Sequence, residues 1–373
     1  MHADVVVVGL GAFGSAALWR LAARGLNVVG VERQAIGHAF GSSHGTTRLF
    51  RVACMEHPGL TAIARKSLEL WTALGEQTGE TYVRQTGSLN VGGPTSRPVK
   101  GAQLAAAGGA PTMDLTHEEL KAKYPQYNLE PGEVAVWDPG AGICYAERTV
   151  KAQVAEAERL GATVYPHTMV TAIEAGAEKV TVRTPTIEIE ADQVVVCGGA
   201  WLRNLVPGLP LEPRRTPLFW FQAMDPDSEA FRLSNFPSFI WEFADGRGLW
   251  GHGSDEGFGV KLGLDGGRAE TGFDADDLDR YIRPLDDIAE LASAVHRAFP
   301  GLDPAPVKAI PCMVTDSPDG QFLVGRYDDR VLIGGGDSGH GFKHCAGIGE
   351  LLAQATTKET PYTDVSFIDP QRF

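Results

Sequence analysis

The feature that most constrains this chain is a glycine-rich turn between an apolar strand and a helix close to the N-terminus. Residues 5–8 are four consecutive valines, an apolar run typical of a central parallel strand that is buried on both faces. Gly9, Gly11 and Gly14 follow with the spacing GxGxxG. The first glycine permits a sharp turn, the second lets the backbone approach a pyrophosphate, and the third lets the helix pack closely on the strand. The stretch therefore predicts a dinucleotide site, and a glycine-rich turn without a ligand is the alternative.

An acidic residue ends the second predicted strand, residues 27–31. The Glu32 carboxylate can accept hydrogen bonds from an adenosine ribose, whereas it would repel the additional phosphate of NADP. The motif thus favours NAD or FAD without distinguishing them. Its position at the start of a chain that must return to the same sheet much later is common in flavoproteins.

Composition excludes several classes of partner. The 33 basic and 47 acidic residues give a net charge of −14, which repels nucleic acid and anionic membranes. No apolar run approaches the roughly 20 residues of a membrane span, and the first strand leaves no room for a signal peptide, so we expect a cytoplasmic protein. The five cysteines form no CxxC pair, which predicts reduced thiols and no metal site.

The order of predicted elements indicates an α/β protein with two interleaved lobes. A second buried strand with a glycine pair, VVVCGGAW at residues 194–201, is expected to return to the opening sheet. Aromatic-rich strands lie elsewhere in the chain, where the strand-helix alternation is lost. We therefore predict a Rossmann-like FAD-binding lobe and an α+β substrate lobe with a mostly antiparallel sheet. The first comprises residues 1–80, 145–215 and 305–373, and the second comprises residues 81–144 and 216–304.

Six segments together resemble the family of monomeric sarcosine oxidase, N-methyltryptophan oxidase and fructosyl amino acid oxidase. They are GLGAFG near the N-terminus, GSSHGTTRLFR at 41–51, VVVCGGAW, GFGVKLG at 257–263, PCMVTDSPDG at 311–320 and GDSGHGFK at 336–343. The resemblance covers almost the whole chain. It implies FAD as cofactor, a fold of the D-amino acid oxidase type, and oxidation of a secondary amine with O2 as acceptor. An NAD-dependent dehydrogenase and a non-enzymatic flavin-binding module are the alternatives from other classes.

The resemblance also implies roles for individual residues. Cys312 matches the cysteine that is bound to the 8α carbon of the flavin, where it would otherwise be read as a buried structural thiol. Arg48 matches an arginine against the flavin, and Lys261 matches the lysine that activates oxygen, with a solvated strand lysine as the alternative. Arg51 and Lys343 match the pair that binds the substrate carboxylate; the alternative is that both pair with surface acids.

Three positions depart from the sarcosine oxidases. Asp265 replaces a histidine, Val314 replaces a tyrosine, and Trp250 takes the place of another pocket tyrosine. The valine enlarges the space near the flavin, and the carboxylate can bind sugar hydroxyls or a protonated amine. We therefore predict a fructosyl amino acid as substrate, with Asp265, Arg48 and Lys261 as candidate catalytic residues. Oxidation of sarcosine, another N-methyl amino acid or a cyclic imino acid is the alternative.

The remaining expectations concern the cofactor contacts and the assembly state. The predicted partners are a small secondary amino acid and O2, and the family suggests a monomer. The residues expected to contact FAD are Gly9, Gly11, Ala12, Phe13, Gly14, Glu32, Arg33, Ser42, Ser43, His44, Thr47, Arg48, Val170, Gly199, Ala200, Trp201, Cys312, Gly339, Gly341, Phe342 and Lys343.

Overall fold

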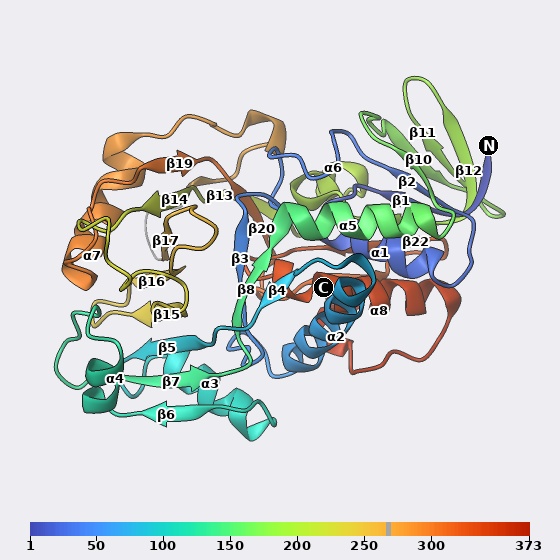
Figure 1. Ribbon diagram of the computed structural model, residues 1–373. Helices are drawn as coiled ribbons and strands as arrows, with labels where there is room; N and C mark the ends of the chain where they lie inside the picture. The colour runs from blue at the N-terminus through green and yellow to red at the C-terminus, as the bar shows by residue number, and fades with distance from the viewer. Residues whose placement is uncertain (266–269) are drawn as a thin grey trace.

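A computed structural model describes residues 1–265 and 270–373, and its first large sheet is built around the N-terminal strand (Figure 1). Strand β1 (His2–Val8) lies between β2 (Val28–Val31) and β12 (Glu188–Val196), and all three are parallel. Strand β9 (Thr163–Tyr165) lies beside β2, and β11 (Val180–Arg183) and β10 (Ala172–Ala175) follow β12. Strand β22 (Val331–Gly335) also pairs with β12, and β21 (Leu323–Arg326) pairs with β22. The valines of β1 are buried on both faces, as the unbroken apolar run predicts.

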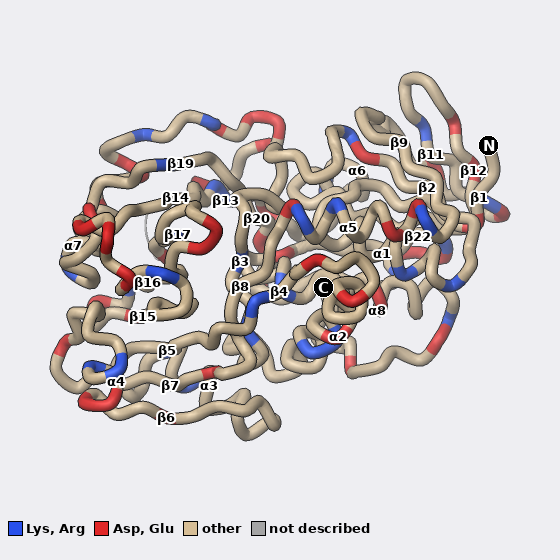
Figure 2. Tube along the Cα trace, in the orientation of Figure 1, with Lys and Arg blue, Asp and Glu red and all other residues tan. Residues whose placement is uncertain are grey.

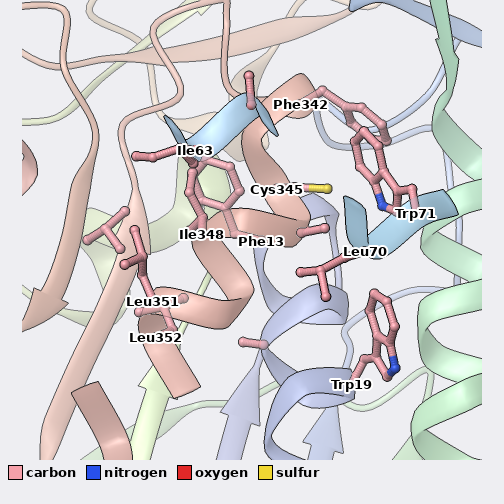
Figure 3. Close-up of a cluster of buried hydrophobic side chains, with 14 of the residues drawn as sticks. Phe13, Trp19, Ile63, Leu70, Trp71, Phe342, Cys345, Ile348, Leu351 and Leu352 are labelled. Carbon is pink, nitrogen blue, oxygen red and sulfur yellow. The ribbon is translucent and has the colours of Figure 1, made fainter. Parts of the chain in front are cut away.

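Four helices cover one face of this sheet. They are α1 (Ala12–Ala22), α2 (Leu60–Thr78), α5 (Ala146–Arg159) and α8 (Cys345–Thr357). Their apolar side chains form one cluster, in which Figure 3 shows Trp71 of α2 beside Phe342, at 6.2 Å between ring centroids. Helix α8 lies so close to α1 that a Cβ on Gly349 would be 2.6 Å from the Cβ of Ala16.

A second sheet of eight strands forms the other lobe in Figure 1. Its order is β19 (Lys308–Ile310), β14 (Leu218–Phe221), β17 (Val260–Asp265), β16 (Gly248–His252), β15 (Ser238–Glu242), β5 (Ser88–Gly92), β7 (Val134–Asp138) and β6 (Met113–Leu115). Only the pair β15 and β5 is parallel. Aromatic side chains fill its core, and the helices of this lobe are α3 (Arg97–Ala107), α4 (His117–Lys123) and α7 (Ala289–Ala298).

Two small sheets connect the large ones. One contains β3 (Thr47–Phe50), β8 (Gly142–Tyr145) and β4 (Val83–Arg84), and the other contains β13 (Glu212–Arg215), β20 (Met313–Asp316) and β18 (Glu270–Thr271). In Figure 1 β3 and β20 run between the two lobes. A short helix α6 (Leu202–Leu205) follows β12.

The predicted α/β fold class is confirmed, with one mostly parallel and one mostly antiparallel sheet. The lobe boundaries stay a prediction; β19 pairs with β14 in the second sheet, although it falls in the segment 305–373 assigned to the first lobe. Figure 2 shows acidic and basic residues interspersed over both lobes. Within the described ranges, no helix has the length and hydropathy that a bilayer crossing requires.

We expect Gly349→Ala to destabilise the protein by about 1–3 kcal/mol, because the added methyl group forces α8 away from α1. Urea unfolding measures the change. The matched control is Gly93→Ala, since a Cβ on Gly93 meets no atom within 4 Å. Equal unfolding midpoints for the two variants would contradict close contact between α1 and α8.

Candidate active site

A cavity of about 830 Å³ extends from the glycine turn after β1 into the space between the two lobes. Its walls combine the carboxyl ends of β1, β2, β12 and β22, where ligands of open parallel sheets bind, with residues of the second sheet. The predicted residues on its wall are Gly9, Gly11, Ala12, Phe13, Glu32, Arg33, Ser42, Ser43, Arg48, Arg51, Val170, Gly199, Ala200, Trp201, Trp250, Asp265, Cys312, Val314, Gly339, Gly341, Phe342 and Lys343.

The glycine turn has no room for side chains. Gly9 has a φ of 83°, and a Cβ there would lie 2.6 Å from the carbonyl oxygen of Cys197. A Cβ on Gly14 would lie 1.8 Å from the carbonyl oxygen of Gly9. Gly14 therefore sets the approach of α1 to β1 and is not on the cavity wall. The Ala12 N–H donates to Ser43 Oγ at 3.0 Å, which ties the following loop to the first turn of α1.

The predicted ribose acceptor, Glu32, lies at the cavity wall and is nearly fully buried. Its carboxylate accepts hydrogen bonds from the N–H groups of Leu10 and Gln34, both at 2.8 Å, and lies 3.4 Å from the His38 ring. Burial opposes ionisation, but His38 and these N–H groups lower the pKa of Glu32 below its ordinary value. The side chain is therefore a fixed anion and acceptor at the end of β2.

Arg33 and Trp201 meet on the same wall, where the guanidinium lies 5.7 Å from the indole centroid. Asp276 accepts hydrogen bonds from Arg33 Nη1 at 2.7 Å and from Trp201 Nε1 at 2.9 Å. Asp276 belongs to the segment between β18 and α7, so the second lobe also contributes to this end of the cavity.

Arg48 and Cys312 lie together farther along the cavity. Arg48 Nη2 donates to the Ser42 carbonyl oxygen at 2.7 Å and lies 3.8 Å from Cys312 Sγ. Burial raises the pKa of the Cys312 thiol, while Arg48 and Lys261 act in the opposite direction. Burial outweighs the two cations, so the pKa of the thiol is raised overall, although both cations are placed to stabilise a thiolate if one forms.

Lys261 does not line the cavity but lies behind Arg48, with only 1% of its surface exposed. Its Nζ donates to the carbonyl oxygens of Gly45 at 2.8 Å and Thr47 at 2.7 Å. It also lies 5.1 Å from the ring centroid of Trp220, whose cluster includes Cys312. The alternative of a solvated strand lysine is therefore wrong, because this side chain is enclosed.

Arg51 and Lys343 converge on a buried carboxylate that the sequence analysis missed. Arg51 forms an ion pair with Glu56, and Lys343 Nζ lies 3.4 Å from the same Glu56 oxygen. Burial opposes ionisation of Glu56, but Arg51 and Lys343 outweigh it and hold its pKa well below the ordinary value. The two cations therefore do pair with an acid, although a buried one and not one at the surface. The trio carries a net charge of +1 and can accept one further carboxylate.

The three residues that depart from the sarcosine oxidases share the cavity wall. Trp250 on β16 pairs in register with Gly263 of β17, two residues before Asp265. Burial raises the pKa of Asp265, and the cations Arg214 and Arg97 act against this rise. Asp265 is exposed to the cavity, so it can meet a polar ligand group there.

Besides Gly14, two predicted cofactor contacts, His44 and Thr47, are not on the cavity wall. Thr47 Oγ1 is hydrogen-bonded to His252 Nε2 at 2.7 Å. His44 is buried, and its ring nitrogens have no hydrogen-bond partner among the described residues. Burial lowers the pKa of His44 to about 3, so the ring is neutral. The fit of the cavity to a dinucleotide therefore rests on the glycine turn and Glu32 and not on this ring.

Sequence reasoning also missed Asp337, which accepts hydrogen bonds from the N–H groups of Thr315 at 3.1 Å and Gly339 at 3.0 Å. It thereby fixes β20, with the preceding Cys312, to the loop before Lys343. Burial raises its pKa to about 6. Its one local signal is an acid inside a run of glycines, GGGDSG at residues 334–339.

Comparisons with known proteins agree with this geometry. The model of the family "FAD dependent oxidoreductase" matches residues 4–355. Monomeric sarcosine oxidase of Streptomyces avermitilis is 33% identical over 99% of this chain and 97% of the relative. N-methyl-L-tryptophan oxidase of Yersinia pestis is 30% identical over the full length of both chains.

Solved structures with similar folds have lower sequence identity. NikD, an unusual amino acid oxidase essential for nikkomycin biosynthesis, has a TM-score of 0.86 at 21% identity, covering 99% of this chain and 98% of its own. Amadoriase I from Aspergillus fumigatus has a TM-score of 0.79 at 19% identity, covering 99% of this chain and 90% of its own. At these identities the likeness shows the fold alone.

We expect Glu56→Gln to bind acetate about tenfold more tightly, because Arg51 and Lys343 lose the carboxylate that competes for them. The same change should destabilise the protein by about 3 kcal/mol, since two buried cations lose their counter-ion. Calorimetric titration with acetate measures the affinity. The control is Glu69→Gln on the exposed face of α2, where the carboxylate pairs with Lys66. Weaker or unchanged acetate binding in Glu56→Gln would show that this anion does not bind at the trio.

Proposed function

The chain belongs to the FAD-dependent oxidoreductase family, and within it we propose that it oxidises a secondary amine bearing a free carboxylate, with O2 as acceptor. Its assignment as an FAD-dependent enzyme is confirmed by the family match and by relatives named as oxidases. The observation that carries the choice of substrate class is the convergence of Arg51 and Lys343 at the cavity wall.

The cavity residues fit FAD at the glycine turn, Glu32 and Arg48. FAD bound there would supply two-electron redox chemistry: the amine would lose a hydride from the carbon next to nitrogen and a proton from nitrogen, and O2 would take up the two electrons and two protons as H2O2. The substrate is left as an imine, which water hydrolyses.

The protein's own residues bind and orient the amine. Arg51 can hold the substrate carboxylate through two parallel N–H groups, and Lys343 adds a second charge. The positive groups around the site favour the neutral form of the bound amine, so no side-chain base is required. Lys261 and Arg48 place positive charge where dioxygen becomes an anion.

The part of the cavity wall formed by Val314 and Asp265 supports a fructosyl amino acid as substrate. Val314 leaves space where a tyrosine would fill it, and Asp265 offers a carboxylate to sugar hydroxyls. The products would be an amino acid, a dicarbonyl sugar and H2O2. Oxidation of an N-methyl or cyclic amino acid is the second candidate, because relatives that are 30–33% identical are named sarcosine and N-methyl-L-tryptophan oxidases.

We further propose that FAD is bound covalently through Cys312, as an 8α-S-cysteinyl link. The short distance between Arg48 and Cys312 Sγ supports this, since a cation favours the thiolate that must react. We also propose that the protein acts as a monomer.

A peroxide assay with fructosyl-glycine, fructosyl-valine and sarcosine tests the substrate. We expect kcat/KM at least about tenfold higher for the fructosyl compounds, because Asp265 can bind their hydroxyl groups. Asp265→Ala should remove this preference while leaving the KM for sarcosine within about twofold. A clear preference of the wild-type protein for sarcosine would favour the second candidate.

Acid precipitation tests the covalent link. We expect yellow colour to remain with the precipitated wild-type polypeptide and to stay in the supernatant for Cys312→Ser, because serine cannot form the thioether. The control is Cys144→Ser, a buried thiol that does not line the cavity. Colour that leaves the wild-type precipitate, or stays with Cys312→Ser, would exclude Cys312 as the attachment site.

A further inference from the structure

The turn before β3 holds Lys261 through a single polarised peptide group. The Gly45 carbonyl oxygen accepts a hydrogen bond from Lys261 Nζ at 2.8 Å. The N–H at the other end of this peptide group belongs to Thr46 and donates to Glu147 Oε2 at 3.0 Å. The Gly45 N–H donates to Glu147 Oε1 at 2.8 Å. One amide plane therefore lies between a carboxylate and an ammonium group.

The backbone at this turn is strained, and the strained conformation determines where its N–H and carbonyl groups point. Gly45 and Thr46 have φ angles of 88° and 64°, and a β-branched residue rarely adopts the left-handed region. This conformation directs both N–H groups to Glu147 and the Gly45 carbonyl oxygen to Lys261, while the Thr46 carbonyl oxygen accepts from the Ala146 N–H at 2.8 Å. Thr47 contributes a second carbonyl oxygen, which accepts from Lys261 Nζ at 2.7 Å and from Arg48 Nη1 at 2.8 Å.

The groups around Lys261 come from seven parts of the chain. They are Arg48 of β3, Cys144 of β8, Glu147 of α5, His252 of β16, Cys312 before β20, His44 before β3, and Lys308 of β19, which lies 4.8 Å from the same Trp220 ring. Glu147 alone among them is a carboxylate. Burial, followed by Arg48, lowers the pKa of Lys261 well below its ordinary value, and Glu147 acts against this shift.

We propose that Glu147 is a positioning residue that keeps Lys261 protonated and in place beside Arg48, acting through the peptide group between Gly45 and Thr46. The negative charge of the carboxylate at the N–H end pushes electron density toward the carbonyl oxygen of this peptide group. The hydrogen bond from the ammonium group to that oxygen is thereby strengthened. The carbonyl oxygens of Gly45 and Thr47 take two of the three Nζ protons. The third remains for an anion formed from dioxygen. The inference about oxygen rests on the proposed function, whereas the charge of Lys261 does not.

The direct test is the titration of Lys261 in the holoenzyme labelled with ¹³C at the lysine ε carbons, with its signal assigned by its loss in Lys261→Met. We expect Glu147→Gln to move the Lys261 midpoint to lower pH by about one unit or more, because the carboxylate that favours the cation is lost. Glu147→Asp, which keeps the charge but withdraws it, should give a smaller shift in the same direction and serves if the glutamine variant does not fold. Glu158→Gln, on the exposed side of α5, should leave the midpoint unchanged.

Stopped-flow mixing of the reduced enzyme with O2 adds the functional readout. We expect reoxidation to follow the protonated fraction of Lys261, so its decline with rising pH should begin at lower pH in Glu147→Gln than in the wild type. A Lys261 midpoint that is the same in wild type, Glu147→Gln and Glu147→Asp overturns the inference. Lys261→Met that reoxidises at the wild-type rate instead overturns the proposed role of Lys261 with oxygen, whatever the titration shows.

Discussion

Buried cations and the few oxygen atoms that satisfy them are the interaction on which this site depends. A charge withdrawn from water is costly unless it is paired and hydrogen-bonded. Lys261 and Arg48 share the Thr47 carbonyl oxygen, and Arg51 and Lys343 share the Glu56 carboxylate. Both arrangements involve β3 or the residues that flank it, so this short strand and its flank bring Arg48 and Arg51 to the cavity wall.

The architecture explains why these charges gather there. Strand β3 pairs with β8 between the two large sheets, and Lys261 reaches it from β17 of the second sheet. Lys343 reaches it from the loop after β22 of the first sheet. Neither large sheet alone contains both pairs of cations, and the cavity walls come from both lobes. The second lobe therefore supplies chemistry as well as a cover for the nucleotide site.

Local patterns predicted the parts of the molecule that depend on neighbouring residues. The valine run, the glycine turn and Glu32 are where the sequence placed them, since the strand-turn-helix-strand motif that contains them spans only about 30 residues. The resemblance extended this to the fold, the family and the class of enzyme. The roles of Arg48, Lys261, Asp265 and Cys312 stay predictions; Arg48, Asp265 and Cys312 line the cavity, whereas Lys261 does not.

Contacts between distant residues could not be predicted in the same way. Glu56 lies 287 positions from Lys343, and Glu147 lies 101 positions from Thr46. No local pattern marks such a pair, because an isolated acid in a sequence is equally compatible with a solvated surface. The pairing of β19 with β14 could not be predicted for the same reason. The two strands are about 90 positions apart, and their pairing depends on the tertiary fold.

The strand order of the first sheet also determines how late in synthesis this sheet can be completed. Strand β12 lies between β1 and β22, and its apolar residues 194–196 are buried partly by β22. Since β22 comprises residues 331–335, nearly the whole polypeptide must leave the ribosome before this sheet has all its strands. A nascent chain therefore exposes the edge of β12 that pairs with β22 while the 134 residues between these two strands are synthesised.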